Sequence, residues 1–402
     1  MWIAQLLAIM GFSSTFPIYA YFIQSLGVED HLVARWSGAV IAISSISMGI
    51  LGPIWGALGD RHGRKVMVIR AMFGGALIIG LQGFSQNVWQ FALLRLIQGA
   101  LTGTVTAATA LVASKTPKER LGETLGKFQL AIFLGQAFGP TTGGFVADTF
   151  GYRATFWLTA IYLLVAGSLI LFLVQEQHEP TAESLEGSLW QRMRQDFSVI
   201  FAGSLLGLVL ALRFALRVGL RITSPTMPLI VQDLMPGSTL LGSASGLLTT
   251  VSGISSALAA PMMGRWADKG DSRLLLLGSA LLAALALAIQ AAAPTYWLLV
   301  AGQFLLGLGI GGTLSVISAY VGRMAPEGRI GTAFGLDALA VSLANAVGPA
   351  GGGWLSDTVS RRSPLVVGAV AMTLAALAVL RLPAGRAEAT SRGVLPGGRP
   401  AS

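Results

Sequence analysis

Twelve long apolar runs follow one another along this chain of 402 residues. A helix needs about 20 mostly apolar residues to cross the hydrocarbon of a bilayer. Since every backbone amide inside lipid needs an internal partner, runs of this length must be helical, and the alternating strands of a membrane barrel are not seen. The approximate cores of the runs are 3–26, 33–57, 66–85, 88–113, 125–147, 154–174, 203–232, 240–263, 274–293, 296–321, 330–354 and 364–382.

Composition excludes a soluble protein of this size. Apolar residues make up 53% of the chain and charged residues 11%, with a mean hydropathy of +0.70. An ordinary soluble domain carries about 25% charged residues, so this chain could not cover a water-facing surface. The sequence therefore predicts an all-α membrane protein with 12 transmembrane helices.

The basic residues are placed unevenly, which predicts how the chain is oriented. If the N-terminus is cytoplasmic, 19 of the 27 Lys and Arg residues fall in inner loops or the C-terminal tail, four in outer loops and four inside the membrane. Cytoplasmic loops are enriched in Lys and Arg, so we expect a multi-pass protein of the cytoplasmic membrane with both termini inside. The outer and intramembrane residues are Arg35, Arg153, Arg361, Arg362, Arg95, Arg213, Arg217 and Arg221.

The remaining composition argues against several activities. The net charge of +9 does not indicate nucleic-acid binding, because the basic residues lie in loops between apolar runs. There is no cysteine, and the three histidines, His31, His62 and His178, all fall in loops. No G-x-x-x-x-G-K-[ST] motif is present, so ATP is not expected as the energy source. We expect neither an enzyme nor a bound metal or cofactor.

A polar segment at 175–197 divides the twelve runs into two sets of six. The predicted organisation is an N-terminal six-helix bundle at 1–174, a cytoplasmic central loop at 175–197, and a C-terminal six-helix bundle at 198–382. The Gly-, Pro- and Arg-rich tail at 383–402 is expected to be disordered.

The two halves repeat one sequence plan. A shift of 208 residues superimposes Pro53 on Pro261, Asp60 on Asp268 and Gly99 on Gly307, and a shift of 209 continues the match. The second register pairs Gly139-Pro140 with Gly348-Pro349, Gly143-Gly144 with Gly352-Gly353, and Asp148 with Asp357. Because each half has six runs, the repeat predicts two parallel halves related by an axis along the membrane normal.

Several motifs resemble those of the major facilitator superfamily. The segment Gly56-Ala57-Leu58-Gly59-Asp60-Arg61-His62-Gly63-Arg64-Lys65 is similar to the signature loop between helices 2 and 3, and Gly264 to Lys269 is a weaker copy. Arg95-Leu96-Ile97-Gln98-Gly99 resembles the helix 4 motif. Gly135 to Gly144 resembles the helix 5 motif of the twelve-helix drug–proton antiporter branch.

The signature loop is expected to act in gating, as the resemblance implies. Its glycines would permit a tight turn and close helix approach, Asp60 would accept bonds from amides at a helix N-terminus, and Glu119 or Glu123 would pair with Arg64. Arg64 and Lys65 could instead face lipid phosphates, and the whole loop could serve only to set topology. The gating residues would be Gly56, Asp60, Arg61, Gly63, Arg64, Lys65 and Asp268.

Two charged residues inside the membrane are candidates for coupling to protons. A cation at the depth of Arg95 costs at least about 2.5–3.5 kcal/mol on insertion scales, so it must face a partner or water. The resemblance implies a part in proton coupling; the alternative is a structural cation bonded to carbonyls. Asp337 is the best membrane carboxylate, and it could either carry a proton or neutralise an arginine.

Helices 5 and 11 carry small residues that suit close packing. Gly135, Gly139 and Gly143 recur every four residues and give a flat stripe for a neighbouring backbone. Pro140 removes one helical hydrogen bond and should bend helix 5. Gly348, Pro349 and Gly352 repeat the arrangement in helix 11. In the resembling family this helix lies at the contact between the halves.

Helix 7 carries Arg213, Arg217 and Arg221 on one stripe about 12 Å long. The motif Pro225-Thr226-Met227-Pro228 should then break the helix. Three cations on a lipid face would be prohibitive, so they should line a central cavity or pair across it. This favours an anionic or carbonyl-rich substrate or a coupling network. In the alternative interpretation, Arg213 lies near the inner surface and its side chain snorkels to the water there. Arg217 and Arg221 would then bond to Gln or Asn amides.

Polar residues of other helices complete the predicted substrate cavity. These residues are Tyr19, Gln24, Gln98, Gln129, Gln136, Gln303 and Asn345. The resulting hypothesis is a monomeric secondary transporter that exports small molecules, drug-like or metabolite, in exchange for protons. The alternative is uptake of an organic anion or sugar by proton symport, which the helix 7 arginines support and the helix 5 motif opposes.

Overall fold

The computed structural model describes residues 1–103, 108–109, 111–112, 116–117, 120–176, 205–269, 271–324 and 330–382. Within these ranges the structure does not describe the side chains at 53, 57, 60, 121–123, 205, 268–269, 314–315, 319, 322–324 and 330–334. The described part is built from helices with short connections, and it contains no strand.

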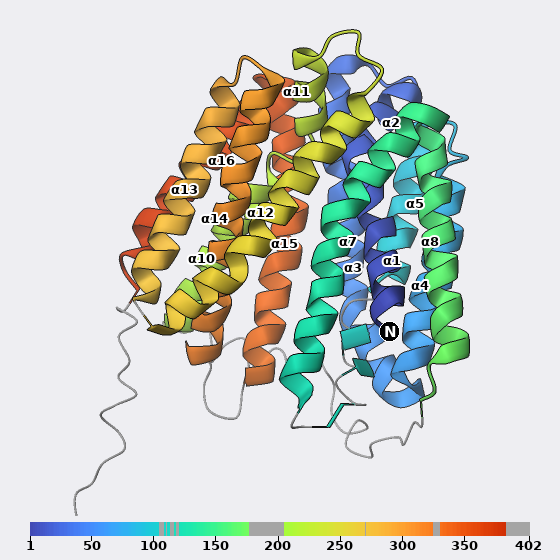
Figure 1. Ribbon diagram of the computed structural model, residues 1–402. Helices are drawn as coiled ribbons and strands as arrows, with labels where there is room; N and C mark the ends of the chain where they lie inside the picture. Colours follow the sequence, from blue (N-terminus) through green and yellow to red (C-terminus); the bar gives the residue numbers. More distant parts are fainter. Residues whose placement is uncertain are drawn as a thin grey trace, which may run out of the picture.

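The N-terminal half holds the helices up to residue 173, and the C-terminal half holds the rest (Figure 1). The first set is α1 (Trp2–Ser14), η1 (Phe16–Ile18), α2 (Tyr19–Ser25), η2 (Asp30–Leu32), α3 (Val33–His62), α4 (Arg64–Gln82), α5 (Val88–Leu101), α7 (Leu121–Phe150) and α8 (Tyr152–Leu173). The second set is α10 (Leu205–Arg221), α11 (Met227–Leu234), α12 (Leu241–Lys269), α13 (Ser272–Ala292), α14 (Tyr296–Met324), α15 (Ile330–Thr358) and α16 (Ser363–Val379).

These helices follow the twelve predicted apolar runs. Among the described residues, eight helical segments are long and apolar enough to cross a membrane, and α5 and α16 are shorter apolar helices. The α10–α11 pair and α15, which carry charged residues in their interiors, fill the two remaining places in the order. Large apolar side chains face outward, as with Phe172 and Trp89, which are 78% and 71% exposed. Such a surface suits lipid and not water.

Two helices are interrupted where proline stands in the sequence. In the first run, Thr15 separates α1 from the short η1, in which Pro17 takes the second position, and α2 then begins at Tyr19. The sequence predicted one continuous helix there. In the seventh run the predicted break at Pro225–Pro228 is confirmed, because α10 ends at Arg221 and α11 begins at Met227.

The signature segment is mostly helical, and its turn is confined to one residue. Helix α3 continues through Gly56 and Gly59 to His62, and α4 begins at Arg64. Gly63 alone forms the turn. Its φ is 99°, a backbone conformation that residues other than glycine rarely adopt. The tight turn therefore depends on one glycine, while Gly56 and Gly59 are helical residues.

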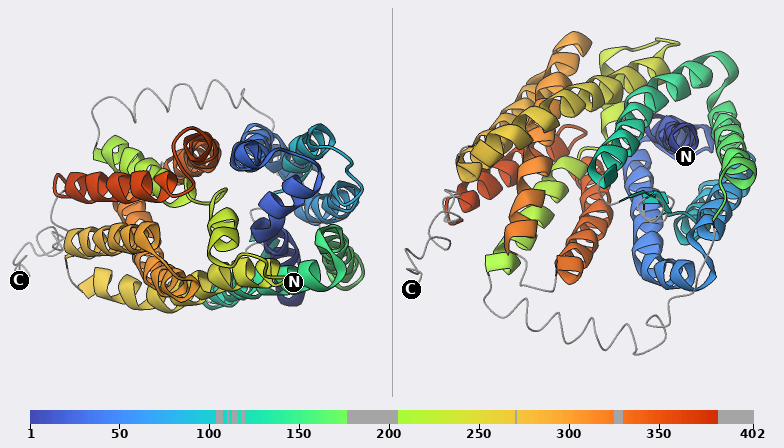
Figure 2. Two further views of the ribbon diagram at one scale, coloured as in Figure 1. Left: turned by 90° about the horizontal axis from the view of Figure 1, so that it is seen from above. Right: turned by 60° about the horizontal axis from the view of Figure 1, so that its bottom comes forward.

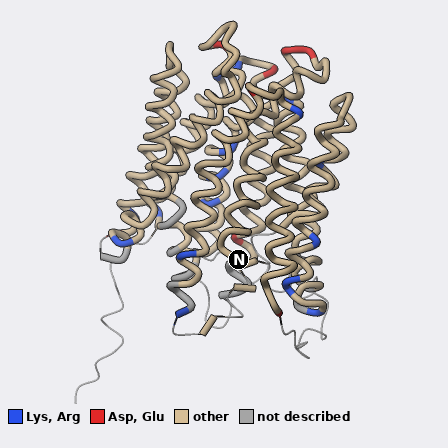
Figure 3. Tube along the Cα trace, turned by 45° about the vertical axis from the view of Figure 1, so that its right-hand side comes forward, with Lys and Arg blue, Asp and Glu red and all other residues tan. Residues whose placement is uncertain are grey.

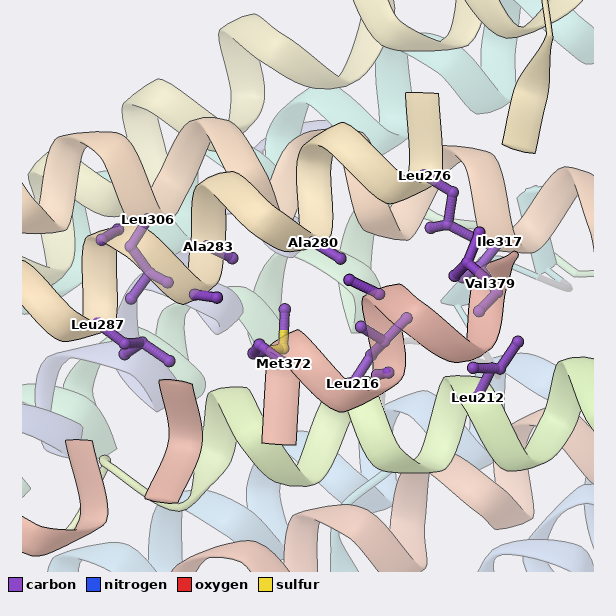
Figure 4. Packing of buried hydrophobic residues seen from close by; sticks show 14 of the residues in the cluster. Leu212, Leu216, Leu276, Ala280, Ala283, Leu287, Leu306, Ile317, Met372 and Val379 are labelled. Atoms are coloured by element: carbon purple, nitrogen blue, oxygen red, sulfur yellow. The ribbon is translucent and has the colours of Figure 1, made fainter. Parts of the chain in front are cut away.

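Each half has its own apolar core. One cluster of buried residues draws on positions 4–170 with Leu229, and the other on positions 206–382. In the second cluster, side chains of α10, α13, α14 and α16 interlock around Met372 and Leu216 (Figure 4). Apart from Leu229 of α11, which packs in the core of the other half, each cluster keeps to its own half, so the halves could move relative to one another with little repacking of either core.

Helices α7 and α12 form one seam between the halves. A Cβ added at Gly144 of α7 would overlap the carbonyl of Gly242, and one at Gly246 of α12 would overlap the carbonyl of Pro140. Side chains larger than hydrogen would push these backbones apart. The contact lies toward the end of the bundle that carries α2 and α11, called here the far end; the near end is where α1 begins (Figure 1).

Helices α15 and α3 form the equivalent second seam. Gly353 of α15 packs on the carbonyl of Ala34, and Gly38 of α3 packs on the carbonyl of Pro349. Shifts of 208 and 209 residues carry α3 onto α12 and α7 onto α15, so the internal repeat relates the two seams residue by residue. The view from the far end shows the two halves side by side with a seam on either flank (Figure 2).

Toward the near end the seam helices diverge. Each carries a second glycine eighteen residues from its seam glycine, which is five full turns away and on the same face. Among the residues that the structure describes, a Cβ added at any of these second glycines would meet nothing within 4 Å. They are Gly56, Gly126, Gly264 and Gly335. Figure 1 shows the divergence, with α12 leaving α7 toward the bottom of the view. The halves therefore touch at the far end and stand apart at the near end.

Candidate functional site

The small residues of helices 5 and 11 serve two different contacts. Gly135, Gly139 and Gly143 of α7 pack on α1, within their own half, where an added Cβ would press on Ile9, Ser13 or Ser14. Gly348 and Gly352 of α15 pack on Arg221 and Ile222 of α10 in the same way. The four-residue stripe thus joins helices inside a half, while Pro140, Pro349 and the glycines beside the stripe face the opposite half.

Arg95 is buried and bonded inside the N-terminal half. Its Nη1 donates to the Tyr19 hydroxyl at 2.9 Å and to Oε1 of Gln98 at 2.8 Å. Its Nε donates to the carbonyl of Val40 at 3.4 Å, and the guanidinium lies over the Tyr19 ring, 4.7 Å from the centroid. The cation is thus held by neutral acceptors and an aromatic face.

The C-terminal half places a glutamine where the N-terminal half has Arg95. Gln82 donates to Gln98 at 2.9 Å in the first half, and Gln303 donates to Gln290 at 3.1 Å in the second. A shift of 208 residues takes Gln82 to Gln290 and Arg95 to Gln303. Both halves therefore contain a buried pair of glutamine side chains, and only the N-terminal half has an arginine at the position of Arg95 and Gln303.

Asp337 of α15 pairs with Arg213 of α10. The carboxylate Oδ1 lies 2.7 Å from the Arg213 Nε, and both side chains are largely buried. Arg213 Nη1 also donates to the Ser318 hydroxyl of α14 at 3.0 Å. The ion pair is the arrangement expected if Asp337 neutralises an arginine, and a part of Asp337 in carrying a proton stays a prediction.

Arg217 and Arg221 continue the stripe above Arg213. Figure 3 shows basic positions stacked one above another inside the bundle. Arg221 packs its Cβ beside Gly348 of α15, and its Cζ lies 5.9 Å from the centroid of Phe16 in the other half. The Nε of Arg217 is buried without a hydrogen-bond partner in the described part of the chain. Arg221 therefore reaches the opposite half, whereas Arg213 pairs within its own half. That the whole stripe lines a central cavity or pairs across it stays a prediction.

Polar groups bridge the halves along the α7–α12 seam. Asp148, at the end of α7, accepts from the backbone amides of Gly242 and Ser243 at 2.8 and 2.7 Å. A carboxylate at a helix N-terminus satisfies free amides and the helix dipole together. About two turns away along each helix, the hydroxyls of Thr141 and Thr250 are 2.7 Å apart.

The far end is tied by further bonds between the halves. The hydroxyl of Tyr21 donates to the carbonyl of Pro228 at 2.7 Å and lies 2.8 Å from the Ser245 hydroxyl. Gln24 donates to Gln232 at 3.0 Å. On the other seam Arg35 forms an ion pair with Asp357. The repeat match of Asp148 with Asp357 was the sequence signal for these two carboxylates, although the sequence did not indicate their partners.

A cavity of about 340 Å³ opens beside the α3–α15 seam. It is lined by Asp30, His31, Ala34, Leu229, Ser356, Asp357, Ser360 and Arg361. The Arg35 ion pair with Asp357 lies at its wall, so this cavity belongs to the far-end closure.

At the near end, Glu176 caps helix α4. Its carboxylate accepts from the backbone amides of Arg64 and Lys65 at 3.1 and 2.8 Å. The sequence proposed Glu119 or Glu123 as partners of Arg64, but Glu119 and the side chain of Glu123 lie outside the described residues, as do the side chains of Asp60 and Asp268. Glu176 was missed because it stands far along the chain, after α8.

The other residues predicted for the cavity have different surroundings. Gln24 is at the far end, where it also donates to the exposed Asp30 at 3.1 Å. Gln129 and Gln136 are exposed on α7, and Gln303 is tied to Gln290. By contrast, Asn345 stands on the α15 face between Asp337 and Gly348, and its Oδ1 is buried without a partner among the described residues.

The sequence profile described as Major Facilitator Superfamily matches residues 1–218 and again residues 209–398. The chain belongs to the major facilitator superfamily. Solved superfamily structures share its fold at low identity. A D-xylose-proton symporter is 18% identical with a TM-score of 0.72, covering 96% of this chain and 97% of that one. Nucleoside transporter NupG is 16% identical with a TM-score of 0.76, covering 95% and 97%.

More similar superfamily members bear names that refer to drug resistance. The chain is 30% identical over 369 residues to "Multidrug resistance protein MdtG" of Dickeya zeae, covering 91% of this chain and 89% of that protein. It is 32% identical over 351 residues to "Multi-drug resistance efflux pump PmrA" of Streptococcus pneumoniae, covering 87% of each. Within the superfamily, the expected resemblance to drug transporters is confirmed.

Proposed function

We propose that this chain exports small molecules, drug-like or metabolite, from the cytoplasm across the cytoplasmic membrane. It acts as a monomer by alternating access, in exchange for protons. The near end, where the chain begins, faces the cytoplasm, as the distribution of Lys and Arg indicates. The relatives whose names refer to multidrug resistance favour export over uptake.

One geometric observation carries the transport cycle. Two related seams hold the halves together at the far end, while the same helix faces stand apart at the near end. Because each half keeps a separate core, rocking about the middle would close the near end and open the far end. The charged residues of both halves lie between these two ends, where a substrate would be exposed to each side in turn.

Asp337 is the proposed proton carrier. As the carboxylate paired with Arg213 between α10 and α15, it would release the arginine when protonated. A change in that pair would alter the packing of α10 on α15, next to the α15–α3 seam. Such a link between protonation and seam geometry is what exchange requires.

The test uses inverted membrane vesicles from cells that produce the chain. An inward-acid gradient should drive accumulation of fluorescent drugs such as ethidium, Hoechst 33342 or a fluoroquinolone, and collapse of the gradient should release them. Vesicles carrying Asp337→Asn should lose the gradient-driven accumulation but retain exchange between labelled and unlabelled drug. Accumulation only in right-side-out vesicles, or none that responds to the gradient, would contradict the proposal.

A further inference from the structure

The membrane interior of this chain contains more cations than its own residues can neutralise. Four arginines, Arg95, Arg213, Arg217 and Arg221, lie deep within the membrane helices, farther from the near-end turns than Arg70 of α4 and Lys127 of α7. Asp337 is the single carboxylate between residues 328 and 356, and no Asp or Glu occurs in the stretches 1–28, 31–59, 61–118, 124–147 or 197–232. The interior therefore holds an excess of three positive charges when Asp337 is ionised.

Two of the four arginines already have their partners. Arg95 is bonded to three acceptors and to an aromatic face, all in the N-terminal half. Arg213 is paired with Asp337 and bonded to Ser318. Neither needs a ligand to satisfy its guanidinium group.

Arg217 and Arg221 differ from the other two. Among the described residues, the Arg221 guanidinium has its aromatic contact with Phe16. Arg217 is attracted by Asp337, but that carboxylate already pairs with Arg213, and the Nε of Arg217 is buried with no acceptor among these described residues. The two residues are one turn apart on the same face of α10, so their like charges reinforce one another. An unpaired buried cation is unfavourable, and two adjacent ones attract an anion strongly.

Neighbouring groups favour a particular kind of anion. Asn345 lies on α15 between Asp337, which pairs with Arg213, and Gly348, which packs on Arg221. The Oδ1 of Asn345 is buried without a partner among the described residues. An amide can present its NH₂ group to an anion after a flip. On the other side Phe16 belongs to an edge-to-face aromatic pair with Tyr19, at 6.1 Å between centroids. The site thus combines donors for an anion with an apolar, aromatic surface.

We infer that Arg217 and Arg221 form the binding site for the acidic group of an amphiphilic organic anion, with the apolar body of the ligand against Phe16. A carboxylate or phosphonate would accept paired N–H bonds from the guanidinium groups, which suit bidentate recognition. The inference rests on the proposed export function and adds the substrate class: organic acids in preference to organic cations. A cationic drug at this level would be repelled by two arginines and would find no free carboxylate to pair with.

The site also spans the two halves. Arg217 and Arg221 belong to α10, and Phe16 belongs to η1 of the N-terminal half. A ligand bound between them would contact both halves, so its binding free energy could differ between the two states of the seams. A substrate site needs this property if binding is to be linked to rocking.

Three naphthalene compounds of matched shape provide the test: 1-naphthylacetate, 1-naphthylacetamide and 1-naphthylmethylamine. Uptake of each radiolabelled compound into inverted vesicles is measured with the full-length chain. The acid should accumulate at least about tenfold more than the amide and the amine, since charge-assisted hydrogen bonds contribute that much to binding. Arg217→Gln and Arg221→Gln should each lower accumulation of the acid about tenfold or more, and Arg217→Lys should retain part of it.

Arg153→Gln serves as the matched control, because this arginine bonds the carbonyl of Gly83 at the far end of the N-terminal half. It should leave the preference for the acid unchanged. Each variant is checked for abundance and a single size-exclusion peak, so that misfolding is separated from loss of binding.

Equal accumulation of acid and amine, no accumulation of the acid, or an unchanged preference in both glutamine variants would overturn the inference. Export of ethidium in the same vesicles would then leave the proposed export function standing, whereas loss of all transport would remove both.

Discussion

Asp148 and Asp357 occupy equivalent positions in the two repeats, and each carboxylate binds the opposite half of the molecule. Asp148 accepts from the first amides of α12, whereas Asp357 pairs with Arg35 near the start of α3. Shifting Arg35 by 208 residues gives Ser243, so even the partners are repeat equivalents. The same carboxylate position thus closes both seams, once through backbone amides and once through a guanidinium.

Asp148→Asn should weaken closure of the far end. The neutral amide can replace one of the two charge-assisted bonds at most, so we expect the closed state to lose about 1–3 kcal/mol relative to the open one. The natural chain has no cysteine, so a single Ser356→Cys in the far-end cavity can report on opening. Its rate of labelling by a membrane-impermeant maleimide, applied from the far side, should rise several-fold.

The control for that change is the next residue along α7. Thr149 bonds only within its own helix in the described structure, to the carbonyl of Phe145 at 2.8 Å and to that of Val146 at 3.5 Å. Thr149→Ala should leave the labelling rate unchanged. Equal rates in the Asp148→Asn variant and the unsubstituted chain would show that the carboxylate does not hold the seam.

Two neighbouring tyrosines allow a comparison of seam and core. Tyr21→Phe removes both bonds across the seam, to Pro228 and Ser245, while Tyr19→Phe removes a bond to Arg95 inside one half. Each change should cost about 1–2 kcal/mol. For Tyr21→Phe this cost should fall on the closed far end relative to the open one, and for Tyr19→Phe on the folded protein relative to the unfolded one. The first should speed far-end labelling with little loss of thermal stability; the second should lower the melting temperature in detergent without altering labelling. The reverse pattern would contradict the assignment of Tyr21 to the seam.

Breaking the Arg213–Asp337 pair should be costly, and removing both charges should be less so. Asp337→Asn leaves a buried guanidinium without its anion, which typically costs about 3–5 kcal/mol. Thermal denaturation of the solubilised protein should show the double change Arg213→Gln with Asp337→Asn to be more stable than Asp337→Asn alone. If the two melt at the same temperature, the pair is not energetically coupled.

Much of this architecture could be predicted from the sequence, and the reasons for the failures are specific. The apolar runs predicted the helices, and the repeat predicted that Asp148 and Asp357 are equivalent. The repeat could not indicate that they meet α12 and α3, because a shift within one chain identifies equivalent positions and not contacts. Likewise the four-residue glycine stripe predicted close packing but not its partner, α1.

The missed features depend on local conformation or on distant segments. The break at Thr15 has one proline as its only sequence signal, and many membrane helices tolerate a single proline without ending. The signature motif looked like a loop, since glycine and charged residues are typical of turns, yet α3 continues to His62. Glu176 reaches α4 from the end of α8, a distance along the chain that no spacing rule covers. For Arg217 and Arg221, the sequence indicated the stripe, but only the contact with Phe16 shows that Arg221 reaches the other half.

The paired glycines of the seam helices lead to a prediction about which positions tolerate a methyl group. A Cβ at Gly38 would overlap the carbonyl of Pro349, while a Cβ at Gly56, five turns along the same face of α3, would meet nothing within 4 Å in the described part of the chain. Gly38→Ala should therefore separate the far-end seam and raise maleimide labelling at Ser356→Cys. Gly56→Ala should leave the far end closed and, by restricting the unfolded chain and raising helix propensity, should be neutral or stabilising by up to about 1 kcal/mol.

The repeat supplies the matched controls for this comparison. Gly246→Ala on α12 should behave like Gly38→Ala, and Gly264→Ala like Gly56→Ala, because the two seams are equivalent. A bulkier change, Gly56→Leu, should block closure of the near end, so that transport stops although the protein remains folded and its far end remains closed. Transport by Gly56→Leu at the rate of the unsubstituted chain would mean that α3 does not meet α15 at this level when the near end closes, and the motion between the halves would have to be sought along other helix faces.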